Sequence, residues 1–179
     1  MDYDDVVVGA GPAGLSAAIR LKTLDPNISV VVVEKGSTVG AHILSGAVID
    51  PIGLDRLTPD WRADGECPLK TPVTADRFYF LGRTGSVRLP NWPMPRLMNN
   101  HGSFVGSLGA VARWLGARAE RMGVEIYPGF AATELLFGDK GEVVGIATGD
   151  MGVGRDGQPK ANFARGMELR GKYVLLYAG

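Results

Sequence analysis

The chain has 179 residues, 45% of them hydrophobic, and its 19 Lys and Arg balance 19 Asp and Glu. This composition is typical of a folded globular protein, and the length allows about one to one and a half domains. A net charge of zero gives no electrostatic basis for binding nucleic acid, which we exclude as a partner. The single cysteine, Cys67, excludes an intramolecular disulfide and cannot alone hold an iron–sulfur cluster.

The N-terminal residues predict a strand, a glycine-rich turn and a helix. The apolar run Asp5–Val8 leads into Gly9-Ala10-Gly11-Pro12-Ala13-Gly14, and the helix is expected over 12–24, with Ala17, Leu21 and Leu24 on its buried stripe. Gly9 permits a tight turn, Gly11 lets backbone approach a pyrophosphate, and Gly14 lets the helix pack against the strand. The first helical turn, with Pro12 and Ala13, offers unpaired N–H groups to the phosphates. This succession predicts a dinucleotide-binding site.

A second apolar strand, Ile28–Val33, ends at Glu34, twenty residues after Gly14. A carboxylate at this position can accept a hydrogen bond from a ribose 2′-hydroxyl, and it argues against the 2′-phosphate of NADP. The alternative is a solvated carboxylate at a strand end. Lys35 is included in the predicted cofactor set, although a solvated charge is the more ordinary interpretation of this lysine. These residues do not separate FAD from NAD, because the two share the adenosine–pyrophosphate half.

Residues 36–51 alternate small and bulky aliphatic side chains without a helical or strand period. A glycine-rich loop of this kind can approach a bound cofactor closely, but its aliphatic residues could equally belong to a core. The 14 uncharged residues from Gly36 to Ile49 are too few to span a bilayer.

Beyond residue 50 the pattern predicts a short helix from Asp50-Pro51 to Leu57, a turn-rich excursion, and a long helix over 103–122 that ends at Gly123. Strands are predicted over 77–81, 86–89, 124–127, 132–137, 142–148 and 172–179, with a polar segment over 150–166. The strand over 124–127 is expected to be parallel, and the next two to form a meander. Because no helix follows the last strand, we expect it to leave apolar surface exposed and the chain to be a piece of a longer protein.

Several uncommon strings resemble the electron transfer flavoprotein–ubiquinone oxidoreductases, and the resemblance extends over almost the whole chain. They are Val39–Ala47, Thr71–Thr74 with Asp76–Phe78, Met98–Gly102, Gly123–Ala132, Gly145–Thr148 and Asp156–Lys160. Members of this family are several times longer, so the resemblance implies an N-terminal fragment. It also implies FAD as the cofactor, with a [4Fe–4S] cluster only in the missing C-terminal part.

The resemblance implies electron transfer from reduced electron transfer flavoprotein to ubiquinone, by an FAD-dependent oxidoreductase whose isolated fragment is inactive. We therefore expect three partners: electron transfer flavoprotein, ubiquinone and the surface of a bacterial or mitochondrial inner membrane. Membrane contact is expected at about 39–60, where the family dips into one leaflet. The predicted fold starts almost at Met1, so no targeting peptide is expected. The resemblance also places Ala41, His42, Ser45 and Gly46 near the flavin, whereas no catalytic residue and no metal ligand is predicted.

The expected fold is an α/β, Rossmann-like FAD- or NAD(P)-binding domain of the glutathione-reductase type, with a β-meander and part of an inserted α+β domain for quinone or substrate. The predicted domains are 1–60 (first part of the FAD-binding domain), 61–101 (partial excursion toward the quinone domain) and 102–179 (helix, third strand, meander and final strand). Two alternatives stay open: a related flavoprotein, such as a geranylgeranyl reductase or a nitrogen-fixation electron carrier, and a non-catalytic truncated product that binds no flavin.

Overall fold

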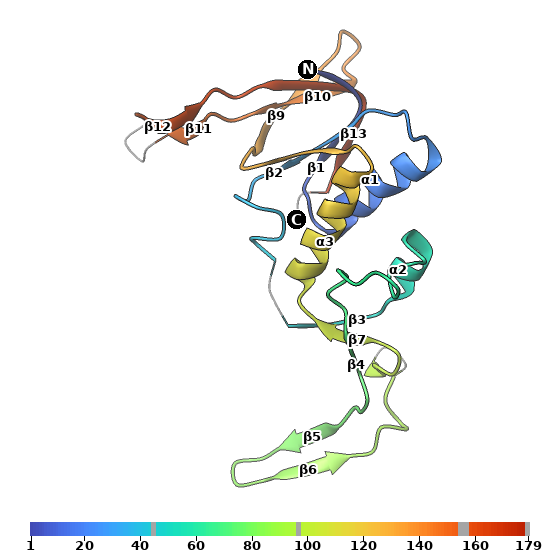
Figure 1. Cartoon of the computed structure of the whole chain (residues 1–179). Helices are drawn as coiled ribbons and strands as arrows, with labels where there is room; N and C mark the ends of the chain where they lie inside the picture. The colour runs from blue at the N-terminus through green and yellow to red at the C-terminus, as the bar shows by residue number, and fades with distance from the viewer. Residues whose placement is uncertain (44–45, 96–97, 154–157, 178–179) are drawn as a thin grey trace. The chain divides into compact units, whose positions relative to one another are not determined.

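The structure is a computed structural model that describes residues 1–43, 46–95, 98–153 and 158–177. The chain divides into two compact units, which we call the first unit (Met1–Leu44 with Gly109–Gly179) and the second unit (Ser45–Leu108) (Figure 1). These units divide the chain at other positions than the predicted domains, whose assignment to flavin and quinone binding stays a prediction.

The first unit is built on a six-stranded mixed sheet in the order β8-β2-β1-β13-β10-β9. The strands are β1 (Asp2–Val8), β2 (Val30–Glu34), β8 (Glu125–Pro128), β9 (Ala132–Phe137), β10 (Val143–Thr148) and β13 (Glu168–Leu176). β8, β2, β1 and β13 are parallel, whereas β10 runs antiparallel to both β13 and β9. The predicted parallel third strand and the meander are therefore confirmed.

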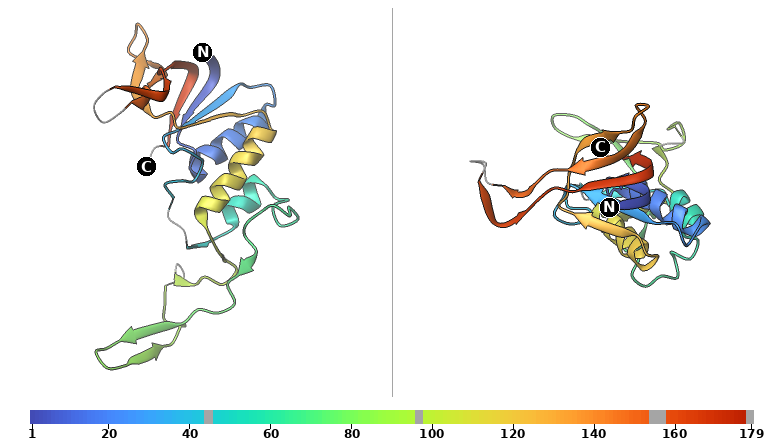
Figure 2. Two further views of the ribbon diagram at one scale, coloured as in Figure 1. Left: turned by 60° about the vertical axis from the view of Figure 1, so that its left-hand side comes forward. Right: turned by 90° about the horizontal axis from the view of Figure 1, so that it is seen from above.

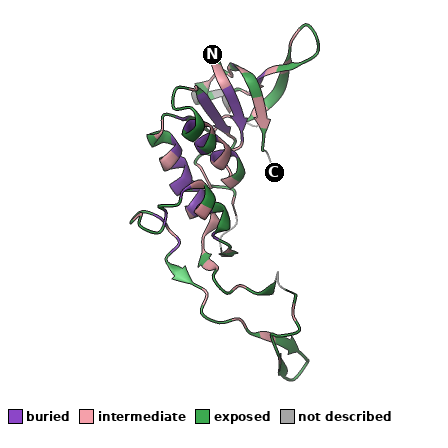
Figure 3. Ribbon diagram, turned by 90° about the vertical axis from the view of Figure 1, so that its right-hand side faces the viewer, coloured by how far each residue is buried: buried purple, intermediate pink, exposed green. Residues whose placement is uncertain are grey.

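Both faces of the central parallel strands β1 and β2 are buried, which explains their unbroken runs of valine. Val6, Val8, Val31 and Val33 form a core cluster with Ile146 of β10 and Leu169 of β13. Val7 points to the opposite face and is also fully buried. On that side lie α1 (Pro12–Leu24) and α3 (Leu108–Arg121), which run side by side in Figures 1 and 2. Figure 3 shows the buried residues concentrated in these strands and helices.

The bounds of α1 are as predicted, but its predicted buried stripe is wrong. The buried residues are Gly14, Leu15, Ala18, Ile19 and Lys22, whereas Leu24 is 67% exposed. The physical reason is Gly14, where α1 packs closely against β1. This contact turns Leu15 and Ala18, one and four residues further along the helix, toward the core. Lys22 is buried because its ammonium group donates to the carbonyl oxygens of Pro26 and Ile28 at 2.6 and 3.0 Å.

The C-terminal part of the first unit differs from prediction in one segment. The polar stretch 150–166 contains two antiparallel strands, β11 (Met151–Val153) and β12 (Pro159–Ala164). The last strand, β13, pairs with β1 on one side and β10 on the other. Its Tyr173 and Leu176 are 70% and 58% exposed, so the expected exposed apolar surface is present.

The second unit has its own small core around Trp61, which is 1% exposed. It comprises α2 (Ile52–Leu57) and a three-stranded sheet of β3 (Ala47–Ile49), β7 (Phe104–Gly106) and β4 (Thr71–Pro72), together with a hairpin of β5 (Phe78–Leu81) and β6 (Ser86–Leu89). The Phe104 ring meets Trp61 edge-on at 5.3 Å, and Leu69 and Cys67 are buried beside this core. Within the described residues, no helix is long and apolar enough to cross a membrane.

The predicted short helix and hairpin are confirmed, but the long helix begins later than predicted. Residues 104–106 form β7 and pair with both β3 and β4, so α3 starts only at Leu108. Phe104 fits the helical period of the buried positions that follow it, yet tertiary pairing outweighs this local signal. Gly123 ends the helix with a φ of 84°, as expected of a C-terminal glycine.

Candidate dinucleotide-binding site

The turn between β1 and α1 requires two of its glycines for internal reasons. Gly9 has a φ of 104°, a conformation that side chains strongly disfavour, and its N–H donates to the Val33 carbonyl oxygen at 2.8 Å. A Cβ atom on Gly14 would lie 2.1 Å from the Gly9 carbonyl oxygen and 3.2 Å from a methyl group of Val7. Gly14 therefore allows the close packing of helix on strand that the sequence predicted.

Gly11 is different, because no protein atom lies within 4 Å of the position that its Cβ would take. Its φ of −75° and ψ of 174° are accessible to any residue, so nothing inside the chain requires a glycine there. Pro12 is the first residue of α1, and the helix starts without a side-chain cap. The first turn consequently keeps backbone N–H donors for an anion, and the space beside Gly11 lets a pyrophosphate approach them. This part of the chain fits the phosphates of a dinucleotide.

Glu34 joins the end of β2 to the glycine turn. Its Oε2 accepts from the Ala10 N–H at 2.9 Å, and its Oε1 accepts from the Gly36 N–H at 2.7 Å. A carboxylate can accept about four hydrogen bonds, so each oxygen retains a lone pair for a ribose hydroxyl. Sequence reasoning missed the bonds to the backbone. They follow from the parallel pairing of Val8 with Val33, which puts Glu34 next to the turn and leaves no signal in the local sequence.

The residues after β2 are held beside Glu34. Gly36 is buried, its carbonyl accepts from the Gly129 N–H at 2.7 Å, and its Cβ position lies 3.4 Å from the Ala41 side chain. The structure therefore brings Ala41 next to a residue that Glu34 contacts. Gly40 has a φ of 78° and its Cβ position lies 2.6 Å from the Gly109 carbonyl oxygen, which fixes this loop against the start of α3.

The other predicted cofactor residues are less closely tied to the turn. Lys35 and His42 are exposed in the first unit, whereas Gly46 belongs to the second unit and Ser45 lies outside the described residues. Their proposed roles stay predictions. Ala13 is exposed in the first turn of α1. In the part of the chain that the structure describes, no group of three or more His, Cys, Asp and Glu side chains could hold a metal ion.

Comparison with known proteins bears on the fold that holds this site. The profile of the NAD(P)-binding Rossmann-like domain matches residues 7–66, so the chain carries a Rossmann-like dinucleotide-binding domain. Among solved structures, a geranylgeranyl bacteriochlorophyll reductase-like protein from Thermoplasma acidophilum superimposes over 99% of this chain and 39% of its own, with a TM-score of 0.66 and 18% identity. A myxobacterial FAD-dependent halogenase covers 99% of this chain and 37% of its own, with a TM-score of 0.61 and 16% identity. These likenesses show the predicted fold.

Curated relatives are much closer in sequence. The probable electron transfer flavoprotein-ubiquinone oxidoreductase of Acinetobacter baylyi is 54% identical over 185 residues, which cover 100% of this chain and 32% of the relative. The human mitochondrial electron transfer flavoprotein-ubiquinone oxidoreductase is 52% identical over 183 residues, covering 99% of this chain and 29% of the relative. The chain spans about a third of the length of these relatives. Along its whole length, this chain is therefore similar to about one third of the length of the electron transfer flavoprotein-ubiquinone oxidoreductases.

Proposed function

We propose that the chain binds the adenosine–pyrophosphate half of FAD, as part of an oxidoreductase that passes electrons from reduced electron transfer flavoprotein to ubiquinone. One observation carries this proposal: the open space beside Gly11 lies next to the Glu34 carboxylate, at the end of the adjacent strand. It occurs in a chain 48 to 55% identical to relatives named for that reaction.

In this proposal the pyrophosphate lies beside Gly11 against the first turn of α1, and a ribose hydroxyl donates to Glu34. The likeness to an FAD-dependent halogenase supports FAD over NAD. Bound FAD would accept and release electrons, while the residues of this chain bind and orient it. Lys35, Ala41, His42, Ser45 and Gly46 remain proposed neighbours of the cofactor, and the Ala41 contact with Gly36 supports one of them.

We assign the [4Fe–4S] cluster to the remaining two thirds of the relatives' length. This chain has one cysteine, Cys67, which is 2% exposed and buried in the second unit. A cluster of this type is held by several thiolates. The electron transfer flavoprotein and ubiquinone are likewise proposed as partners of the whole protein.

We further propose that the second unit contacts a membrane surface through the β5–β6 hairpin. Phe80, Leu81 and Val87 are 67%, 75% and 64% exposed, and Trp92 in the following loop is 87% exposed. In the predicted membrane segment, 39–60, Val48 and Ile52 are 49% and 52% exposed. The hairpin is therefore the larger apolar surface, and exposed tryptophan is typical of membrane interfaces.

Replacing Glu34 by glutamine tests the cofactor site, because the amide keeps the size of the side chain but loses its charge and one acceptor. We expect the Kd for FAD, measured by flavin fluorescence, to rise about tenfold. Glu120→Gln is the matched control, since Glu120 is an exposed carboxylate of α3. Equal affinity of the Glu34→Gln and control proteins would remove Glu34 from the site, and tighter binding of NAD than of FAD would contradict the choice of cofactor.

A further inference from the structure

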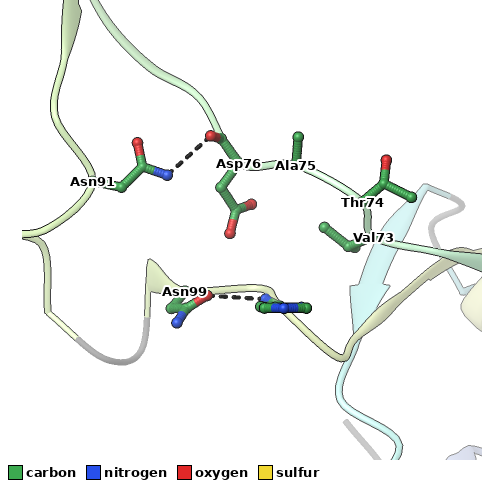
Figure 4. Close-up of a pocket in the computed structure, with 7 residues that line it drawn as sticks. Val73, Thr74, Ala75, Asp76, Asn91 and Asn99 are labelled. Carbon is green, nitrogen blue, oxygen red and sulfur yellow. Dashed lines mark hydrogen bonds between the residues drawn. The ribbon is translucent and has the colours of Figure 1, made fainter.

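A cavity of about 180 Å³ lies in the second unit, away from the glycine turn in sequence and unused by the proposed electron transfer. Its lining residues are Val73, Thr74, Ala75, Asp76, Asn91, Asn99 and His101. Figure 4 shows the Asp76 carboxylate pointing toward the segment that carries Asn99. The Asn91 amide closes one side by donating to the Asp76 backbone carbonyl at 2.9 Å.

The charge in this cavity is negative. The two carboxylate oxygens of Asp76 accept from the backbone N–H and the side-chain amide of Asn100, at 2.8 and 3.0 Å. These bonds hold the pKa of Asp76 below its usual range, so the carboxylate is ionised at neutral pH. Within the described residues neither lysine nor arginine forms an ion pair with Asp76. The Asn100 dipoles therefore stabilise its charge, with a smaller electrostatic contribution from His101, and lone pairs are left to face the cavity.

The cavity offers both donors and acceptors. The Asn99 side-chain oxygen accepts from the His101 backbone N–H at 3.0 Å, which leaves the Asn99 amide group as a donor, and the acceptors come from other residues. Besides Asp76, the Asn91 side chain keeps its carbonyl oxygen, since its amide nitrogen is the donor to Asp76, and Thr74 adds a hydroxyl. A primary ammonium group complements this set, because it has one positive charge and three N–H donors. The ionised carboxylate opposes an anion, although the lining also includes His101. The volume accommodates a small head group rather than a nucleotide.

The cavity lies at the base of the exposed hairpin. Asp76 precedes β5 by two residues, and Asn91 follows β6 by the same interval. Cross-strand pairing puts Phe78 opposite Leu89 and Phe80 opposite Val87, so one face of the hairpin is entirely apolar. A two-stranded hairpin with an uncovered apolar face is marginally stable in water and favours an apolar environment.

We propose that this cavity binds the ammonium head group of phosphatidylethanolamine while the apolar face of the hairpin enters the lipid. The inference rests on the proposed membrane contact and adds the lipid that is recognised. A lipid with this head group complements the site through its ammonium, which faces the Asp76 carboxylate.

The test compares vesicles of pure phosphatidylcholine with vesicles containing equal parts of phosphatidylethanolamine. The choline head group carries the same charges but has no N–H donor, so it is a matched control lipid. Binding of the full chain is measured by flotation and by Trp92 fluorescence, because the other tryptophans, Trp61 and Trp114, are 1% and 5% exposed. We expect about two- to fivefold tighter binding to the ethanolamine vesicles. Equal binding to both lipids overturns the head-group proposal and leaves the membrane contact standing.

Two variants assign the preference to the cavity. Asp76→Asn removes the charge. Val73→Phe fills the cavity, because the Val73 side chain points into the space between Asp76 and the segment that carries Asn99 (Figure 4). Each should abolish the preference and leave binding to phosphatidylcholine unchanged. If Asp76→Asn unfolds, Val73→Phe decides the question, and a preference that survives Val73→Phe overturns the proposal. The double variant Phe80→Ser, Val87→Ser should instead weaken binding to both kinds of vesicle. If the unaltered chain binds neither, the membrane contact is wrong and the head-group proposal falls with it.

Discussion

At the scale of single residues, the three glycines of the turn have different roles, and two substitutions should distinguish a role in stability from a role in binding. Gly14→Ala drives a Cβ into the Gly9 carbonyl oxygen, so we expect a loss of about 1–3 kcal/mol in unfolding free energy. Gly11→Ala meets no protein atom and should stay within about 1 kcal/mol of the original chain. The new methyl group should nevertheless weaken FAD binding, because it occupies the space proposed for the pyrophosphate.

Urea denaturation and flavin titration measure the two effects on the same proteins. An Ala at position 11 that lowered stability as much as one at position 14 would contradict the open space seen at Gly11. The sequence motif alone predicted the roles of these glycines correctly, since each role depends on local backbone geometry. It did not predict that Glu34 binds Ala10 and Gly36, because those contacts depend on the pairing of β1 with β2.

Two neighbouring aspartates should affect stability with opposite sign. Burial raises the pKa of Asp5, with the charge of Asp4 adding to it. The folded state therefore gains stability from protonated Asp5 at low pH and loses it as the pH rises through the raised pKa. For Asp4, the hydrogen bond from Lys172 and those from Ser29 lower the pKa. Its contribution is present above the unfolded pKa and is lost as the pH falls.

We consequently expect Asp5→Asn to raise the unfolding free energy at pH 7, and Asp4→Asn to reduce it. Both differences should shrink toward acid pH, where both carboxyl groups are protonated in the unfolded chain. Chemical denaturation of the two variants between acid and neutral pH measures this. Destabilisation by Asp5→Asn at pH 7 would show that the carboxylate has a favourable role that its burial does not indicate.

At the scale of elements, prediction succeeded where local pattern and tertiary burial agree. Helix α1 has its predicted bounds because proline begins it and Asp25-Pro26 ends it. The helix predicted over 103–122 began too early, because Phe104 fits the helical period but is paired as part of β7. Strands β11 and β12 went unpredicted because their polar sequence has no alternation to reveal them. The β5–β6 hairpin was predicted from its turn. Its apolar residues resemble those of a buried strand, so the pattern did not predict that they are exposed.

At the scale of the whole molecule, the predicted β–α–β order leads to the parallel trio β8-β2-β1. The insertion of β13 between β1 and β10 depends on contacts between residues more than a hundred positions apart, such as Val6 with Val174. Such pairing leaves no signal in local sequence. The same is true of the division into two units, because the second unit is an excursion between Leu44 and Gly109 that interrupts the first.

The division into two units predicts where a bound dinucleotide should protect backbone amides from hydrogen exchange. If the cofactor binds at Gly9–Gly14 and Glu34, hydrogen exchange should slow at the amides of the turn and at Gly36, all of which lie in the first unit. A ligand at a hundred times its Kd adds about 2.7 kcal/mol to the free energy of openings that release it, so exchange there should slow about a hundredfold. The β5–β6 hairpin should exchange at its original rate. Mass spectrometry of peptides from both units, with and without FAD, measures the contrast. Protection centred on residues 71–106 would place the cofactor in the second unit and contradict the proposed site.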